Sequence, residues 1–215
     1  RSTPPVSVNL PKSQKVFQSD RIFPVFTNML PEGANRRALC RARKVDESDF
    51  FGMLEMICGM DAIQQFVPAW MPQMEQFFRM VVFDYLFANE DAHMKNFSLI
   101  NRSGEYFLAP AYDLVNTCIH IQSGSDLGLL DGLSPDIEKS DVHDRTLHPC
   151  RLDFERFAER IGLPKKRAAS VLDMFMEIPQ ETYSLIDRSF LNDKMKRIYK
   201  RVIEERKTRF IRQSK

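Results

Sequence analysis

The sequence predicts an α+β protein, with a small mixed domain over residues 1–62 and a mostly helical C-terminal lobe over residues 63–215. Two patterns predict this fold class. Apolar and polar residues alternate near the N-terminus, which is typical of a strand, whereas apolar residues recur at helical spacing through most of the second half. A strand–turn–strand pattern near residue 100 interrupts the helical half and predicts one hairpin within it.

The composition is that of a folded domain without a membrane span. The 215 residues are 43% hydrophobic and 28% charged, which is enough apolar material to bury a sizeable core. Arg79, Asp84 and Glu90 interrupt the most apolar segment, so no run approaches the roughly 20 apolar residues that cross a bilayer. We therefore expect neither a disordered tail nor a fibre, and no association with a membrane.

The cysteines and the first residues bear on the cellular compartment. No two of the four cysteines form a CxxC pair, which argues against a structural zinc site or a thioredoxin-like site. They are Cys40, Cys58, Cys118 and Cys150. We expect buried reduced thiols, and because residues 1–5 do not resemble a secretory signal, we expect a cytoplasmic protein.

Charge gives little information about partners. The formal net charge of +2 is too small to indicate nucleic-acid binding by itself. Basic residues gather over residues 194–215, where a solvated helical face explains them better than a direct contact with DNA or RNA does.

The N-terminal domain is expected to contain both kinds of element. Residues 5–11 alternate and end in proline, which indicates a short strand. The chain is then expected to turn helical, with an apolar cluster over residues 22–30 and a Pro-Glu-Gly breaker after it. Carboxylates at residues 46–49 predict the start of a further helix that runs to about residue 57.

The C-terminal lobe is expected to be built around one buried helix. Residues 74–88 are apolar nearly all round, so that helix should be buried on most sides. Residues 97–100 and 105–108 are expected to pair as the strands of the hairpin. Further helices are predicted over the ranges 153–161, 165–178 and 193–211, with a break at Gly162-Leu163-Pro164.

A polar loop at residues 89–96 directly follows the buried helix. The hairpin after it is expected to bring Asp113 back to the loop, so that Asp91, Asn96 and Asp113 can converge. Four residues separate Asp91 from Asn96, which is the D-x-x-x-x-N spacing of a kinase catalytic loop. Phosphoryl transfer uses such a set, with one carboxylate for the attacking hydroxyl and a second carboxylate and an amide for Mg²⁺. His93 and Lys95 add donors or positive charge for the transferring phosphoryl group.

Each of these residues also has a structural interpretation. Aspartate and asparagine often cap helices and form turns, and His93 and Lys95 could merely orient the loop. The combined order of buried helix, spaced loop, hairpin and second aspartate favours chemistry over structure alone.

The polar loop resembles a known family. NEDAHMKNFSLI followed by YFLAPAYDL is similar to the catalytic loop and metal-binding segment of HipA-type serine/threonine kinases, the toxins of toxin–antitoxin modules. PPVSVNLP, IFPVFTNMLPEG and FFGMLEMICGMD resemble the small N-terminal domain of the same family. The resemblance implies that Asp91 is the catalytic base, that Asn96 and Asp113 hold Mg²⁺ with ATP, and that His93 and Lys95 support the loop.

The resemblance also implies partners. The family phosphorylates a protein serine, with an aminoacyl-tRNA synthetase as the family substrate. Its antitoxin is a HipB-like helix-turn-helix protein, through which the toxin is brought to DNA indirectly.

The middle of the chain departs from the family pattern. The family places a nucleotide-binding lobe before the catalytic helix, but here Asp61-Ala62 leads almost at once into that helix, and no G-x-G-x-x-G or Walker motif occurs. Either the residues are pieces of a longer protein joined together, or the chain is a degenerate form without the lobe. In the second case it would be a non-catalytic subunit of a toxin–antitoxin complex. A lipid or small-molecule kinase is a third alternative, which the N-terminal resemblance disfavours.

Overall fold

The computed structural model describes residues 22–23, 63–64, 66–93, 96–102, 105–120, 126–128, 132–134 and 137–211. Helices dominate this part of the chain, beside a small sheet, which confirms the predicted α+β class. The helices are α3 (Trp70–Leu86), α4 (Asp141–Thr146), α5 (Arg151–Arg160), α6 (Lys165–Met176), α7 (Gln180–Arg188) and α8 (Asp193–Thr208).

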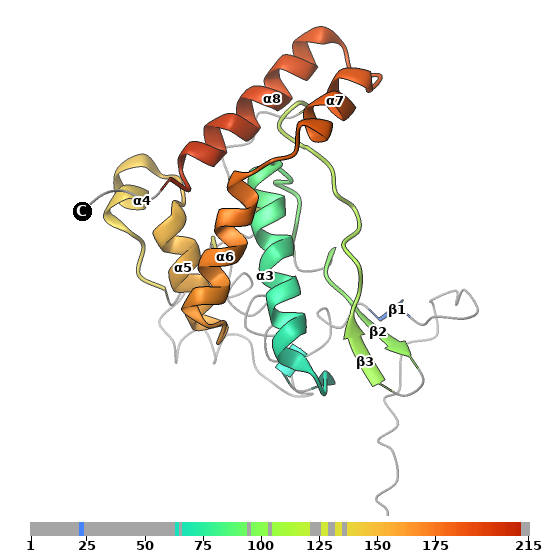
Figure 1. Ribbon diagram of the computed structural model, residues 1–215, viewed down its shortest axis with the longest axis vertical. Coiled ribbons are helices and arrows are strands. Elements are labelled where there is room, and N and C mark those ends of the chain that lie inside the picture. Colours follow the sequence, from blue (N-terminus) through green and yellow to red (C-terminus); the bar gives the residue numbers. More distant parts are fainter. Residues whose placement is uncertain are drawn as a thin grey trace, which may run out of the picture.

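Helix α3 is the central element. Helices α5 and α6 lie along one side of it, the hairpin lies on the other, and α8 lies across its C-terminal end (Figure 1). It begins at Trp70, earlier than the sequence pattern indicated, and it includes Pro72 in its first turn. Proline is tolerated there because the first backbone N–H groups of a helix have no intrahelical partner.

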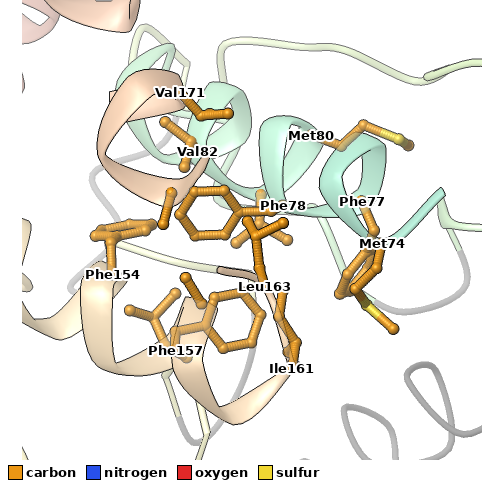
Figure 2. Close-up of a cluster of buried hydrophobic side chains, with 14 of the residues drawn as sticks. Met74, Phe77, Phe78, Met80, Val82, Phe154, Phe157, Ile161, Leu163 and Val171 are labelled. Atoms are coloured by element: carbon orange, nitrogen blue, oxygen red, sulfur yellow. The ribbon is translucent and has the colours of Figure 1, made fainter. Parts of the chain in front are cut away.

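The core forms where α3 meets α5 and α6. Phe77 and Phe78 of α3 are fully buried and contact Phe157 of α5, with ring centroids 6.5 and 6.1 Å apart (Figure 2). Phe77 also meets Phe97, just before the hairpin, edge-on at 5.0 Å. Burying each such ring stabilises the fold by about 2–3 kcal/mol. This packing holds α3 in place against α5, and the polar loop starts after its C-terminal end.

The sheet has the order β1-β2-β3 and is antiparallel throughout. Its strands are β1 (Ile22–Phe23), β2 (Leu99–Arg102) and β3 (Glu105–Leu108). Leu99 lies opposite both Leu108 and Phe23. The predicted hairpin is confirmed, but its first strand runs from residue 99 to residue 102 rather than from 97 to 100, because the pairing with β3 continues through Arg102. The expectation that residues 22–30 are helical is wrong at residues 22–23, because the two apolar residues extend the hairpin as a third strand instead.

Several expectations have mixed outcomes. The helices predicted over 153–161, 165–178 and 193–211 are confirmed. Gly162, with φ at +77°, lies in the turn that separates the first two helices. Helices α4 and α7 were not predicted. The expected strand near residue 8 and helix near residue 50 lie outside the described residues, as do Cys40 and Cys58. Cys150 is a buried free thiol as expected, whereas Cys118 is a free thiol that is only half-buried. In the described part, every helix is too short or too polar to cross a membrane.

Candidate active site

The end of α3 is shaped by the segment that follows Asp113. Ala88 has a left-handed backbone with φ at 55°, which turns the chain sharply out of the helix. Asn116 Nδ2 donates to the Phe87 carbonyl at 2.8 Å, and the Thr117 backbone N–H donates to the Ala88 carbonyl at 2.9 Å. These bonds satisfy helix-end carbonyls that would otherwise lack partners. They also attach the two halves of the site to each other.

The structure brings together three of the predicted site residues. Asn96 Nδ2 donates to Asp113 Oδ2 at 3.2 Å and to the Asp91 backbone carbonyl at 3.4 Å. Asp113 has a left-handed backbone with φ at 58°, a conformation that aspartate adopts more readily than most residues. Because the Asn96 amide donates through nitrogen, its oxygen and the second Asp113 oxygen are the atoms that could hold a cation.

Asp91 and His93 occupy different environments in the same tight turn. Asp91 is exposed, and its backbone carbonyl accepts the His93 N–H at 2.8 Å. The His93 ring is half-buried, and its Nδ1 is buried without a hydrogen-bond partner among the described residues. Lys95 lies outside the described residues. Asp91 is therefore accessible to a substrate hydroxyl, whereas His93 faces the protein with one nitrogen.

Gly128 lies against the backbone of the polar loop. A Cβ at this position would lie 2.5 Å from the Ala92 backbone nitrogen and 2.9 Å from the Asp91 carbonyl carbon. Real Cβ contacts are essentially never this short, so only glycine allows the approach. Sequence analysis did not find Gly128, because nothing local to its sequence indicates a contact with a loop more than 30 residues away.

Asn89 connects the site to a buried carboxyl group. Its Nδ2 donates to Asp84 Oδ1 at 2.9 Å and to the Asp113 backbone carbonyl at 3.1 Å. Burial raises the pKa of Asp84 to about 6, although the Asn89 hydrogen bond opposes the shift. Sequence analysis placed Asn89 in the polar loop but assigned it no role, because its partners are set by tertiary structure.

A small cavity adjoins this carboxyl group. Its volume of about 10 Å³ is close to that of a single water position. Asn89 Oδ1 is buried and has no hydrogen-bond partner within the described part of the chain, so one water there would satisfy it. The cavity is lined by Val81, Asp84, Asn89, Ala92, Phe97, Leu127 and Gly128.

The donor set is suited to a hard divalent cation. Carboxylate and amide oxygens are ligands that Mg²⁺ accepts, and Mg²⁺ is usually held by one or two carboxylates plus phosphates and water. Asp113 and Asn96 supply such a pair. No cluster of three or more His, Cys, Asp or Glu side chains suitable for a metal occurs among the residues that the structure describes, so a fully protein-ligated site is not formed there.

Comparison with known proteins agrees with the resemblance noted in the sequence. A family model described as the HipA-like C-terminal domain matches residues 37–182, which is more than half of the chain. The chain belongs to the HipA family. A second model, described as the HipA N-terminal domain, matches residues 1–63.

One curated relative is also similar to part of this HipA-family chain. It is an "Uncharacterized protein" of Haemophilus influenzae, 38% identical over 65 residues. The match covers 28% of this chain and 61% of that protein. The chain thus spans about three fifths of the relative.

Proposed function

We propose that this HipA-family chain carries the catalytic and metal-binding half of an ATP-dependent kinase that phosphorylates a protein serine or threonine. The observation that carries the proposal is the hydrogen bond between Asn96 and Asp113, made beside the exposed Asp91. Two residues 17 positions apart meet through side chains that both suit Mg²⁺. A merely structural role for the loop requires neither the left-handed aspartate nor the exposed carboxylate.

The proposed roles follow from the positions. Asp91 accepts or orients the proton of the attacking hydroxyl, since its carboxylate is exposed. Asn96 and Asp113 hold Mg²⁺, which when bound offsets the charge of the ATP phosphates. The resemblance to the family, rather than a described position, suggests that His93 and Lys95 support the loop and the phosphoryl group.

The nucleotide requires a further element. The 215 residues contain no G-x-G-x-x-G or Walker motif that would cover the phosphates. We propose that a nucleotide-binding lobe outside this sequence completes the enzyme. Tyr112, Leu114 and Val115 are 38 to 47% exposed beside Asp113, and an apolar surface of this kind is one that such a lobe would cover.

The absence of those motifs also favours a second candidate function, a non-catalytic subunit that binds a HipB-type antitoxin. For both candidates, the family suggests a cytoplasmic protein brought to DNA through the antitoxin. For the kinase it suggests an aminoacyl-tRNA synthetase as the protein substrate. Binding of Mg-ATP separates the two.

The test compares the 215-residue chain with the same chain given a HipA nucleotide-binding lobe, either inserted after residue 62 or added as a separate protein. We expect Mg-ATP binding by calorimetry and transfer of labelled phosphate only when the lobe is present. Asp113→Ala in the completed enzyme should abolish Mg²⁺-dependent binding, because the metal loses its carboxylate. Unchanged Mg-ATP affinity in Asp113→Ala would remove Asp113 as a ligand. A completed enzyme that does not bind Mg-ATP would favour the non-catalytic subunit.

A further inference from the structure

A buried arginine on the last helix contacts the segments that surround the polar loop. Arg206 is 3% exposed and belongs to α8, the helix that lies across the C-terminal end of α3 (Figure 1). Its Nη1 donates to the Tyr85 carbonyl at 2.5 Å and to the Asp126 carbonyl at 3.1 Å. Its Nη2 donates to Glu90 Oε1 at 2.6 Å. One guanidinium thus joins the last turn of α3, the residue before Asp91, and the segment that contains Gly128.

Glu90 depends on this arginine. The Glu90 side chain is only 7% exposed, and its second oxygen, Oε2, is buried with no hydrogen-bond partner among the described residues. A buried carboxylate requires a cation or several hydrogen bonds to remain charged. Arg206 provides the ion pair, so the position of Glu90 is fixed by α8. Since Glu90 and Asp91 are adjacent, fixing Glu90 restricts the backbone from which Asp91 projects.

The second connection reaches the same loop from the other side. Asp126 is bonded to Arg206 through its carbonyl and also through Oδ1, at 3.3 Å. Gly128, two residues further on, is packed against the Asp91 and Ala92 backbone with no room for a Cβ. Arg206 therefore contacts Glu90, which precedes Asp91 in the sequence. It also contacts Asp126, which belongs to the segment that packs against Asp91 through Gly128.

The arginine is itself held in place. Its Cζ lies 5.2 Å from the centroid of the Tyr85 ring, and the Tyr85 hydroxyl accepts a hydrogen bond from Arg209 at 3.1 Å. Arg209 and His148 also contact Asp126 Oδ2, at 2.7 and 2.6 Å. Such a network leaves the guanidinium one orientation, and a planar fork with several donors suits this role better than an ammonium group does.

We propose that Arg206 is a positioning residue, which fixes the orientation of Asp91 relative to the metal-binding pair without contacting substrate. The proposal rests on the proposed kinase function. It assigns a role to α8, which lies beyond residue 182, where the match to the HipA-like C-terminal domain ends.

Two variants and one control test the proposal. Arg206→Lys keeps the charge and most of the volume, but a single ammonium cannot reproduce the fork. Glu90→Gln removes the charge pair and leaves the two carbonyl contacts of Arg206 intact. The control is Arg151→Lys, because Arg151 is also buried and its side chain bonds two carboxylates and a carbonyl, none of which belongs to the polar loop.

The first measurement is steady-state kinetics in the enzyme completed with a nucleotide lobe. For Arg206→Lys we expect kcat to fall about 100-fold, as for a misplaced catalytic group. We expect the Kd of Mg-ATP to stay within about twofold, because Asn96 and Asp113 are unchanged. Glu90→Gln should lower kcat in the same direction, and Arg151→Lys should leave kcat unchanged. Equal effects of Arg206→Lys and Arg151→Lys on kcat would overturn the proposal.

The second measurement does not depend on activity. Hydrogen exchange on the 215-residue chain should show the amides of residues 91–93 exchanging about tenfold faster in Arg206→Lys, with the mid-helix amides of α3 unaffected. Exchange that rises evenly over α3 and the loop would mean a purely structural arginine and would overturn the proposal. If the completed enzyme is inactive but the loop alone loosens, the proposed kinase function fails while the link between Arg206 and the loop stands.

Discussion

Each end of helix α3 carries a buried carboxyl group, and the pKa values of the two groups are shifted in opposite directions. Near its start, Glu75 lies between two guanidinium groups, with bonds of 2.8 Å to Arg79 and 2.7 Å to Arg167. Burial would raise the pKa of Glu75, but these two partners outweigh it and lower the pKa. Near its end, Asp84 has no ion pair with a cation in the described part of the chain, and burial raises its pKa to about 6.

The difference shows which end of the helix serves stability. A carboxylate with two cations contributes to the fold, whereas a carboxyl group that is buried without a cation in the described part of the chain costs free energy when it ionises. Costly arrangements persist mainly where a site requires them. The end of α3 near Asp84 is also where Asn89 holds the Asp113 backbone. The following predictions test this contrast, beginning with the largest effect.

The largest effect is expected at the exposed carboxylate of the site. Asp91→Asn keeps the size of the side chain but cannot accept the hydroxyl proton, so phosphate transfer by the completed enzyme should fall about 10²–10⁴-fold. Because Asp91 is exposed, the melting temperature should not change. Asp144→Asn, another exposed carboxylate, is the control and should be fully active. Undiminished phosphate transfer by Asp91→Asn is the result that removes Asp91 as the base.

The next effect concerns stability alone. Phe157→Ala removes a fully buried ring from between α5 and α3, and should lower the free energy of unfolding by about 3–5 kcal/mol. Phe190→Ala provides the matched control, since Phe190 is fully exposed, and its effect should be within about 0.5 kcal/mol. Urea denaturation measures both. Similar losses in the two variants would contradict the described core.

The third prediction concerns pH. Asp84 has its pKa raised from 3.8 to about 6, so the folded state holds its proton more tightly than the unfolded state does. The protonated Asp84 side chain therefore stabilises the folded state fully below about pH 4, and this stabilisation is lost as the pH rises through about 6. Asp84→Asn cannot ionise, so it should be more stable than the parent by up to about 3 kcal/mol at pH 7.5. The advantage should disappear near pH 4. If the two proteins differ in unfolding free energy by the same amount at both pH values, the pKa of Asp84 is not raised by folding.

The smallest effect is expected at the other end of the helix. Glu75→Gln should lower the free energy of unfolding by about 1 kcal/mol at pH 7, a modest value because Arg79 and Arg167 are both partly exposed. The pKa of Glu75 is lowered in the folded state. The stabilisation that Glu75 provides is therefore fully present above the unfolded pKa of 4.5, and it is lost as the pH falls through the lower pKa of the folded state. Urea denaturation at pH 7 and pH 3 checks this. A stabilising Glu75→Gln at pH 7 would remove the contrast between the two ends.

The sequence predicted the elements that bury an apolar face. Helix α3 and the hairpin strands were found because their periodicity reflects burial. The spacing of Asp91 and Asn96 was found because it is local, and Asp113 was added because the predicted hairpin returns the chain to the loop. Helix α4 buries no residue and α7 buries only Ile186, so neither leaves a clear apolar period. The D-x-x-x-x-N spacing identified the candidate site, but not what supports it.

The supporting residues were missed for a physical reason. Asn89, Gly128 and Arg206 act through contacts with partners that are distant in sequence or set by the bend after α3. Composition and local pattern carry no signal for such contacts. Arg206 in particular lies in a basic segment that was interpreted as a solvated face, although its own side chain is buried.

The contact between Arg206 and Glu90 has a consequence for the newly made chain. The two residues are 116 positions apart, so at synthesis rates of roughly 5–20 residues per second Arg206 is added on the order of ten seconds after Glu90. Contacts of such long sequence separation also require the entropy of closing a long loop to be overcome first. During this interval a nascent chain carries every residue of the polar loop but not the arginine that holds it. The contact that orders the loop therefore cannot form until at least the 116 residues after Glu90 have been made.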